Sequence, residues 1–192
     1  MQYVLTPKSK NTTGHCWWDN AFSNEELDTL QKLASEQNKA ALVGGSDTPV
    51  ENVRRSQVGW LSCTPEFSWV YDKLAEIVSE LNATYYRFDL VGFGEALQLT
   101  NYSYENLGTY KWHQDFGTTG PSRKLSVIVQ LSDPNEYEGG TIQLLNSSTP
   151  VDIERKRGLV TVFPAWMLHQ VTPVTKGTRQ SLVAWITGPA FR

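Results

Sequence analysis

Residues 125–145 read Leu-Ser-Val-Ile-Val-Gln-Leu-Ser-Asp-Pro-Asn-Glu-Tyr-Glu-Gly-Gly-Thr-Ile-Gln-Leu-Leu, and this stretch decides the fold class. A short apolar run ends at residue 131, and a second begins at residue 141. Between them lie Asp133-Pro134-Asn135 and Gly139-Gly140, which are residue types that dominate turns. Short apolar runs bounded in this way are typical of β-strands joined by tight turns.

The same pattern extends outward in both directions from this stretch. It predicts strands at residues 85–91, 96–102, 109–113, 125–131, 141–145, 159–163, 167–171 and 181–186. Many short strands at this spacing indicate a β-sandwich or a barrel.

The N-terminal part of the chain predicts helices. Ser23 is followed three residues later by Glu26, which is the pattern of a capping box, and apolar residues continue at helical spacing to about Gln37. A second apolar stripe predicts a helix that Pro65 opens and that ends at residue 82 or 83. We also expect strands at residues 3–5, 15–18 and 54–61, and a loop at residues 43–52. This loop and the strand after it, residues 43–60, are a candidate lid or edge of a substrate groove. Helices followed by many strands favour helices packed outside one β core.

Composition narrows the class of protein. The 192 residues carry a net charge of −3, which argues against a nucleic-acid partner. No apolar run reaches transmembrane length, and the N-terminus lacks the basic start and apolar core of a signal peptide. We therefore expect a soluble, cytoplasmic protein without a membrane partner, with Cys16 and Cys63 as free thiols. We expect one domain over residues 1–192, with strands and support helices at 1–84 and the β core at 85–190.

A metal-ligand pattern lies at the end of one predicted strand. His113 and Asp115 are separated by one residue, so on a strand their side chains leave the same face. His169 lies on a later predicted strand, and two histidines with one carboxylate form the ligand set of non-haem Fe(II) oxygenases. The third histidine of the chain, His15, has no ligand-spaced partner, so we predict no site role for it.

A cation and a hydroxyl follow the second histidine. Arg179 and Ser181 are two residues apart near the start of the last predicted strand, so they also share a face. A guanidinium pairs bidentately with a carboxylate, most strongly where water is excluded. A fixed cation near such a metal can hold a dicarboxylate co-substrate.

Three stretches resemble one enzyme family. Residues 158–179 resemble the C-terminal motif of the 2-oxoglutarate- and Fe(II)-dependent dioxygenases, in particular the prolyl 4-hydroxylase-like branch with its bacterial PKHD-type hydroxylases. Residues 125–140 resemble the central strand and turn of that branch, and residues 97–102 with 110–115 resemble its entry to the first ligand pair. The resemblance covers roughly residues 85–190.

The resemblance implies a mainly β fold with flanking α-helices, namely a double-stranded β-helix, which is a jelly-roll or cupin-like barrel. It implies Fe(II) on His113, Asp115 and His169, and 2-oxoglutarate chelated to the iron with its far carboxylate on Arg179. Tyr102 is implied to line the co-substrate pocket, although its spacing to the first histidine is longer than in the family. Tyr104 and Tyr110 therefore compete with it for that role.

The implied reaction is the O₂-dependent hydroxylation of a C–H bond, with succinate and CO₂ as co-products and ascorbate as a candidate reductant. The leading substrate is a proline in a peptide or protein. Asp115 favours hydroxylation, because halogenating relatives have a small residue there. Trp185 stands where nucleic-acid demethylases have a second arginine, which speaks against that activity. The alternatives are an oxygenase acting on a free amino acid or small metabolite, and a non-catalytic β-barrel binding module.

Overall fold

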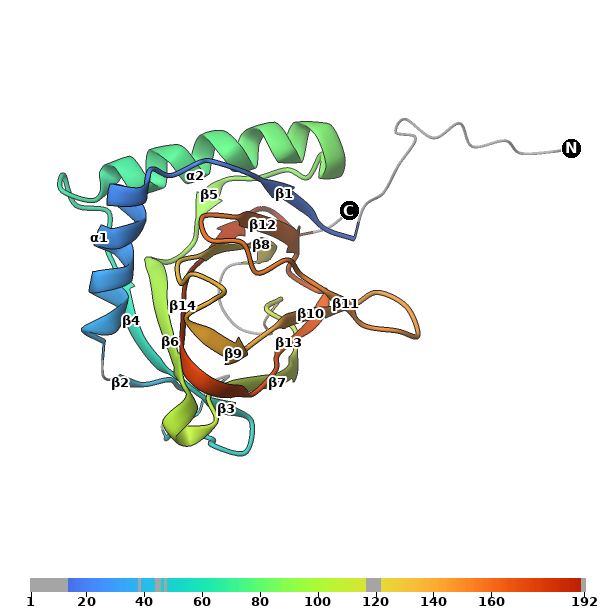
Figure 1. The fold of residues 1–192 in the computed structure, drawn as a ribbon. Coiled ribbons are helices and arrows are strands. Elements are labelled where there is room, and N and C mark those ends of the chain that lie inside the picture. The colour runs from blue at the N-terminus through green and yellow to red at the C-terminus, as the bar shows by residue number, and fades with distance from the viewer. Residues whose placement is uncertain (1–13, 38, 44–45, 47, 117–121, 191–192) are drawn as a thin grey trace, which may run out of the picture.

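Two antiparallel β-sheets enclose the interior of the molecule (Figure 1). The computed structural model describes residues 14–37, 39–43, 46, 48–116 and 122–190. The larger sheet has the order β1 (Cys16–Trp18), β12 (Val160–Pro164), β8 (Arg123–Gln130), β14 (Val174–Thr187), β6 (Leu97–Ser103), β4 (Gln57–Leu61) and β2 (Lys39–Ala40), and the short strands β5 (Gly92–Phe93) and β9 (Tyr137–Gly139) also pair with β14. The smaller sheet has the order β11 (Val151–Asp152), β10 (Ile142–Leu145), β13 (Leu168–Val171), β7 (Thr109–His113) and β3 (Arg54–Arg55).

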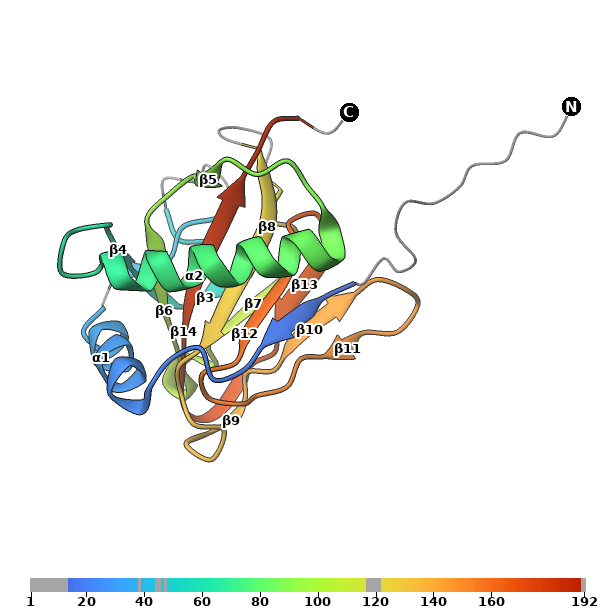
Figure 2. The ribbon, with the colours of Figure 1, turned by 90° about the horizontal axis from the view of Figure 1, so that it is seen from above.

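Two helices cover the outer face of the larger sheet. Helix α1 (Asn24–Ser35) lies beside β6 and β14, and α2 (Ser68–Leu81) lies across the strands of the sheet (Figure 2). The capping box predicted at the start of α1 is confirmed, since the Ser23 and Glu26 side chains each bond the backbone N–H of the other. The apolar stripes of both helices pack on one cluster of buried side chains that includes Leu74, Val127 and Leu182. The expected arrangement of helices outside a β core is therefore confirmed.

The opposite face of the larger sheet turns toward the smaller sheet. Along β14, Leu182 and Ala184 belong to the cluster under the helices, whereas Arg179, Ser181, Val183 and Trp185 line a cavity between the sheets. This separation follows from the two-residue period of a strand. The sequence alternation thus builds an apolar layer on one face and leaves polar side chains on the other.

Most of the predicted strands are present, but two predictions were wrong. No strand forms at residues 85–91: α2 continues into a π-helical turn (Asn82–Tyr86), which ends where Arg87 adopts the left-handed conformation at φ 56°. The Asn82 side chain then bonds the backbone N–H and carbonyl of Phe88, which stabilises an irregular segment instead of a strand. The strand predicted at 54–61 is divided at Ser56, with β3 in the smaller sheet and β4 in the larger.

Further differences concern the ends of elements. Residues Val174–Thr187 form one strand that is longer than the strand predicted at 181–186, with Gly177 at φ 64° and a shifted register against β9. A 3₁₀ turn (Tyr104–Asn106) precedes β7. The strand predicted at residues 3–5 lies outside the described residues, and the division of the chain at residues 84 and 85 stays a prediction.

Two other expectations concern cysteines and membranes. Cys16 and Cys63 are both free thiols, as predicted; the first is buried and the second exposed. Within the described ranges, no helix has the length and apolar character that crossing a bilayer requires.

Candidate metal and co-substrate site

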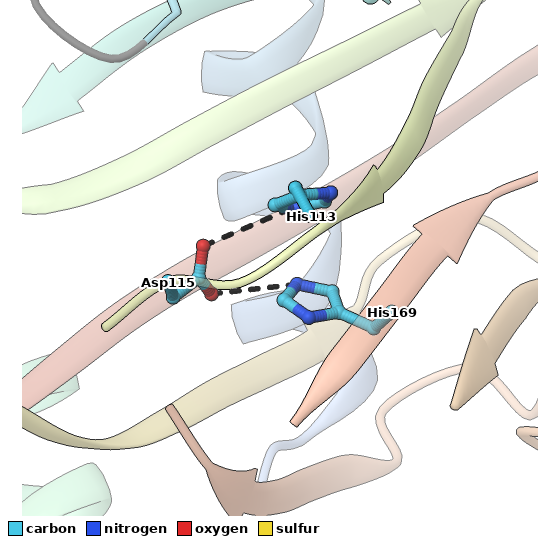
Figure 3. Close-up of side chains that lie close together, drawn as sticks. All are labelled: His113, Asp115 and His169. Carbon is cyan, nitrogen blue, oxygen red and sulfur yellow. Dashed lines mark ion pairs between the residues drawn. The ribbon is translucent and has the colours of Figure 1, made fainter. Parts of the chain in front are cut away.

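The two strands that carry the histidines are direct neighbours in the smaller sheet. His113 at the end of β7 is paired in register with His169 on β13, and the two ring centroids are 4.1 Å apart. Asp115 follows β7 in a bend, where its backbone N–H donates to the Ala165 carbonyl, 2.9 Å away. Figure 3 shows both imidazoles directed at the Asp115 carboxylate. The sequence pattern and the strand pairing together bring the three predicted ligands to one place.

Both histidines present the same ring nitrogen to the carboxylate. The Nε2 atom of His113 lies 3.7 Å from Oδ1 of Asp115, and that of His169 lies 3.4 Å from Oδ2. The other nitrogen, Nδ1, lies 2.7 Å from the Lys111 carbonyl in His113 and 2.8 Å from the Met167 carbonyl in His169. Because a carbonyl only accepts, Nδ1 carries a proton and donates, which leaves Nε2 for a metal ion.

The charges of the three groups are strongly coupled. Burial, followed by the neighbouring His169, lowers the pKa of His113 to about 3, so this imidazole is neutral at ordinary pH. Burial opposes the ionisation of Asp115, but its interactions with His169 and, to a smaller extent, with His113 hold its pKa far below the usual range. Burial also lowers the pKa of His169, yet attraction to Asp115 outweighs it and the net shift is upward. The carboxylate is therefore ionised.

These three residues form a cluster that fits a metal ion. Their possible ligand atoms all lie within 4.8 Å of one another. Two imidazole nitrogen donors and one carboxylate oxygen suit Fe(II) and leave other coordination positions open.

The predicted cation lies in the same cavity as the cluster. Arg179 and Ser181 both line it, and the Arg179 side chain is 1% exposed. Its Nη2 atom has no hydrogen-bond partner among the described residues. Burial lowers the pKa of Arg179, which nearby Tyr137 and Tyr102 partly offset. A buried guanidinium with a free donor fits a carboxylate ligand, which is the far end of a dicarboxylate.

The three competing tyrosines are placed differently. Tyr102 is 4% exposed, lines the cavity and is paired in register with Arg179. Tyr110 also lines the cavity, but its ring is stacked on His113 with centroids 3.4 Å apart. Tyr104 is 52% exposed and lies in the 3₁₀ turn after β6. Tyr102 thus lies beside Arg179, whereas Tyr110 lies beside His113.

The sequence did not reveal several other residues that line or support the cavity. Arg54 lines it and donates from Nη2 to Gln98 Oε1 over 2.9 Å. Trp185 lines the cavity as well. From the sequence alone, this residue served only as an argument against nucleic-acid demethylation. Ser126 on β8 donates to Asp115 Oδ2 over 2.8 Å. No motif marks these residues, because strand pairing alone brings them to the cavity.

Comparisons with known proteins agree with this geometry. The model of the 2OG-Fe(II) oxygenase superfamily matches residues 97–187, which include all three residues of the cluster and Arg179. Over these 91 of its 192 residues, the chain is similar to the 2OG-Fe(II) oxygenase superfamily. The resemblance inferred from the sequence is thereby confirmed, and with it a family that uses Fe(II), 2-oxoglutarate and O₂.

Individual relatives of this oxygenase share its sequence in part and its fold more widely. A PKHD-type hydroxylase of Prochlorococcus marinus is 39% identical over 80 residues, which are 41% of this chain and 36% of that protein's length. A Pseudomonas putida prolyl-4-hydroxylase superimposes with a TM-score of 0.72 over 92% of this chain and 94% of its own, at 19% identity. A Trichoplax adhaerens prolyl hydroxylase, solved with a peptide fragment of hypoxia inducible factor, gives a TM-score of 0.75 over 91% and 84% of the two chains, at 15% identity. These likenesses confirm the double-stranded β-helix.

Proposed function

We propose that this oxygenase hydroxylates a C–H bond with Fe(II), 2-oxoglutarate and O₂, and releases succinate and CO₂. The observation that carries the proposal is one cavity lined both by a two-histidine, one-carboxylate cluster and by a buried arginine with a free donor. In this proposal His113, Asp115 and His169 hold the iron. Bound iron and 2-oxoglutarate supply the oxidising chemistry, and the protein supplies ligands, orientation and exclusion of water.

In this proposal the metal-ligand cluster and Arg179 have separate roles. The Nε2 atoms of the two histidines and the Asp115 carboxylate would coordinate the metal and leave coordination positions open for co-substrate and O₂. Arg179 pairs with the far carboxylate of 2-oxoglutarate, Ser181 adds a hydroxyl, and Tyr102 forms the adjoining wall. Because the arginine is almost fully buried, its charge acts on the co-substrate with little screening by water.

The substrate that we propose is a proline in a peptide or protein. Two solved structures of the same fold are prolyl hydroxylases, and one of them holds a peptide. An exposed aromatic ring also lies next to the cavity: Trp60 is 51% exposed, and its ring centroid is 6.2 Å from that of Trp185, which lines the cavity. Aromatic surfaces of this kind are used to dock proline-containing peptides.

Two linked assays test the proposal. Purified protein with Fe(II), 2-oxoglutarate and ascorbate as reductant is offered a library of proline-containing peptides and, separately, free amino acids. We expect succinate formation above the rate without substrate, and mass spectrometry is expected to find one added oxygen on proline. The matched inactive control is His113→Ala, which removes a metal-binding nitrogen.

The outcomes separate the alternatives. An added oxygen only on free amino acids favours the small-metabolite oxygenase. Absence of succinate under every condition, together with no metal binding, favours a non-catalytic binding module and contradicts the proposal.

A further inference from the structure

Ser126 is a buried residue that touches the metal-ligand cluster without belonging to it. Its side chain is 0% exposed, and its hydroxyl donates to Oδ2 of Asp115 over 2.8 Å. A hydroxyl bond to an ionised carboxylate is stronger than a bond between neutral groups. Ser126 is therefore the side chain best placed to fix the orientation of this carboxylate.

The backbone of Ser126 is held from both sides. It lies within the central strand β8, paired with Phe163 on β12 and with Trp185 on β14. Asp115 lies in a bend just before residues 117–121, so its own backbone has no strand pairing. The hydrogen bond thus ties a carboxylate on irregular backbone to a rigid position in the sheet.

Other contacts with the Asp115 carboxylate do not replace this bond. The indole of Trp185 lies close enough to favour the ionised carboxylate, but its Nε1 forms no hydrogen bond of acceptable geometry among the described residues. The two imidazoles lie at 3.7 and 3.4 Å, and a bound metal ion would take up their Nε2 atoms. Once a metal is bound, Ser126 is the remaining neighbour that donates a hydrogen bond to this side chain.

We propose that Ser126 is the positioning residue of the metal site: its hydroxyl fixes the plane of the Asp115 carboxylate so that one oxygen ligates the metal. This inference rests on the proposed function, because it assigns Asp115 as a ligand. The hydrogen bond uses a lone pair of Oδ2, and this disfavours bidentate coordination of the metal by both carboxylate oxygens. Bidentate coordination would use one of the coordination positions that 2-oxoglutarate and O₂ need.

The experiment compares two buried serines. Ser126→Ala removes the hydrogen bond to Asp115, whereas Ser132→Ala removes an equally buried hydroxyl that accepts from the Gln180 backbone N–H over 2.8 Å. Ser126→Thr restores a hydroxyl at the same place. Each metal-free protein is titrated with Mn(II) by isothermal calorimetry, and its thermal midpoint is measured without metal.

We expect Ser126→Ala to weaken Mn(II) binding by roughly 10- to 100-fold, which is typical of losing an outer-shell partner of a ligand. Ser126→Thr is expected to recover the affinity, and Ser132→Ala to leave it unchanged. Should the alanine variant not fold, Ser126→Cys keeps the volume with only a weak donor and is expected to lose affinity in the same way.

Two results overturn different claims. Equal Mn(II) affinity in wild type and Ser126→Ala, or an equal loss in Ser132→Ala, overturns the positioning role of Ser126. A wild-type protein that binds no Mn(II) at all contradicts the proposed function itself.

Discussion

Tyr102 and Arg179 are directly opposite each other on the paired strands β6 and β14, and the Arg179 guanidinium carbon lies 5.7 Å from the centroid of the Tyr102 ring. Directly opposite residues on an antiparallel pair project from the same face. Both side chains line the same cavity as the metal-ligand cluster. This pairing favours Tyr102 over Tyr104 and Tyr110 as the tyrosine beside the proposed co-substrate, and the assignment stays a prediction.

The tyrosine assignment predicts a difference between two conservative variants. Tyr102→Phe is expected to raise the apparent KM for 2-oxoglutarate several-fold, because a buried hydroxyl near the co-substrate is worth about 1 kcal/mol. Tyr104→Phe is the matched control, since this tyrosine is exposed in the turn after β6. Steady-state succinate formation at varied 2-oxoglutarate measures both. An equal effect of the two variants would show that Tyr102 has no special contact.

Replacing the buried Arg179 is expected to reduce 2-oxoglutarate affinity more strongly than replacing Tyr102. Arg179→Ala removes a charge-assisted pair worth about 2–3 kcal/mol, so 2-oxoglutarate affinity is expected to fall by roughly 30- to 150-fold. Arg179→Lys retains the charge but not the planar fork, and it is expected to recover only part of the affinity. Calorimetric titration with 2-oxoglutarate in the presence of Mn(II) measures this directly. An unchanged affinity in Arg179→Ala would exclude Arg179 as the co-substrate anchor.

The metal cluster predicts a contrast between histidines. His113→Ala removes one nitrogen donor and is expected to weaken Mn(II) binding by more than the roughly 10- to 100-fold typical of an outer-shell loss. His15→Ala is the control, because His15 lies just before β1, in contact with Trp17 and away from the cluster. Metal content after dialysis, together with calorimetry, checks the prediction. Equal metal binding by the two variants would refute the ligand assignment.

The sequence predicted the local features of this fold well. The capping box of Ser23 and Glu26 and the strand at residues 109–113 depend on neighbouring residues and their spacing, which a single sequence contains. The strand predicted at residues 85–91 was wrong, because a short apolar run does not distinguish a strand from the irregular end of a helix. There the side chain of Asn82, six residues before Phe88, decided the outcome.

The sequence predicted the metal ligands, but it did not predict the other residues that contact them or line the cavity. His113, Asp115 and Arg179 were predicted from motif spacing, and the structure brings all three to one cavity, while their roles stay predictions. Ser126 lies on β8 of the larger sheet and bonds Asp115, which follows β7 of the smaller sheet. Arg54 enters the cavity because the predicted strand divides between the two sheets at Ser56. Contacts of this kind depend on register, which one sequence does not specify.

The start of α1 predicts a pH-dependent stability that is independent of the metal site. Glu26 Oε2 accepts from the Ser23 backbone N–H and lies 2.8 Å from Lys73 Nζ on α2. Burial opposes its ionisation, but the bonds from Lys73 and Ser23 and the charge of Lys73 lower its pKa below 4.5 in total. A carboxyl with a lower pKa in the folded state stabilises the fold above its unfolded pKa, and this contribution is lost as the pH falls through the folded value.

Glu26→Gln is therefore expected to lower the free energy of unfolding by about 0.5–1 kcal/mol at pH 7, the scale of a partly exposed ion pair. The difference from wild type is expected to vanish below the folded pKa, because wild-type Glu26 is then neutral as well. Glu80→Gln, at an exposed position near the end of α2, controls for the loss of one negative charge. Urea unfolding at several pH values between neutral and strongly acidic measures all three proteins. A wild-type advantage that stays constant with pH would mean that glutamine weakens the cap itself and that the charge of Glu26 contributes nothing.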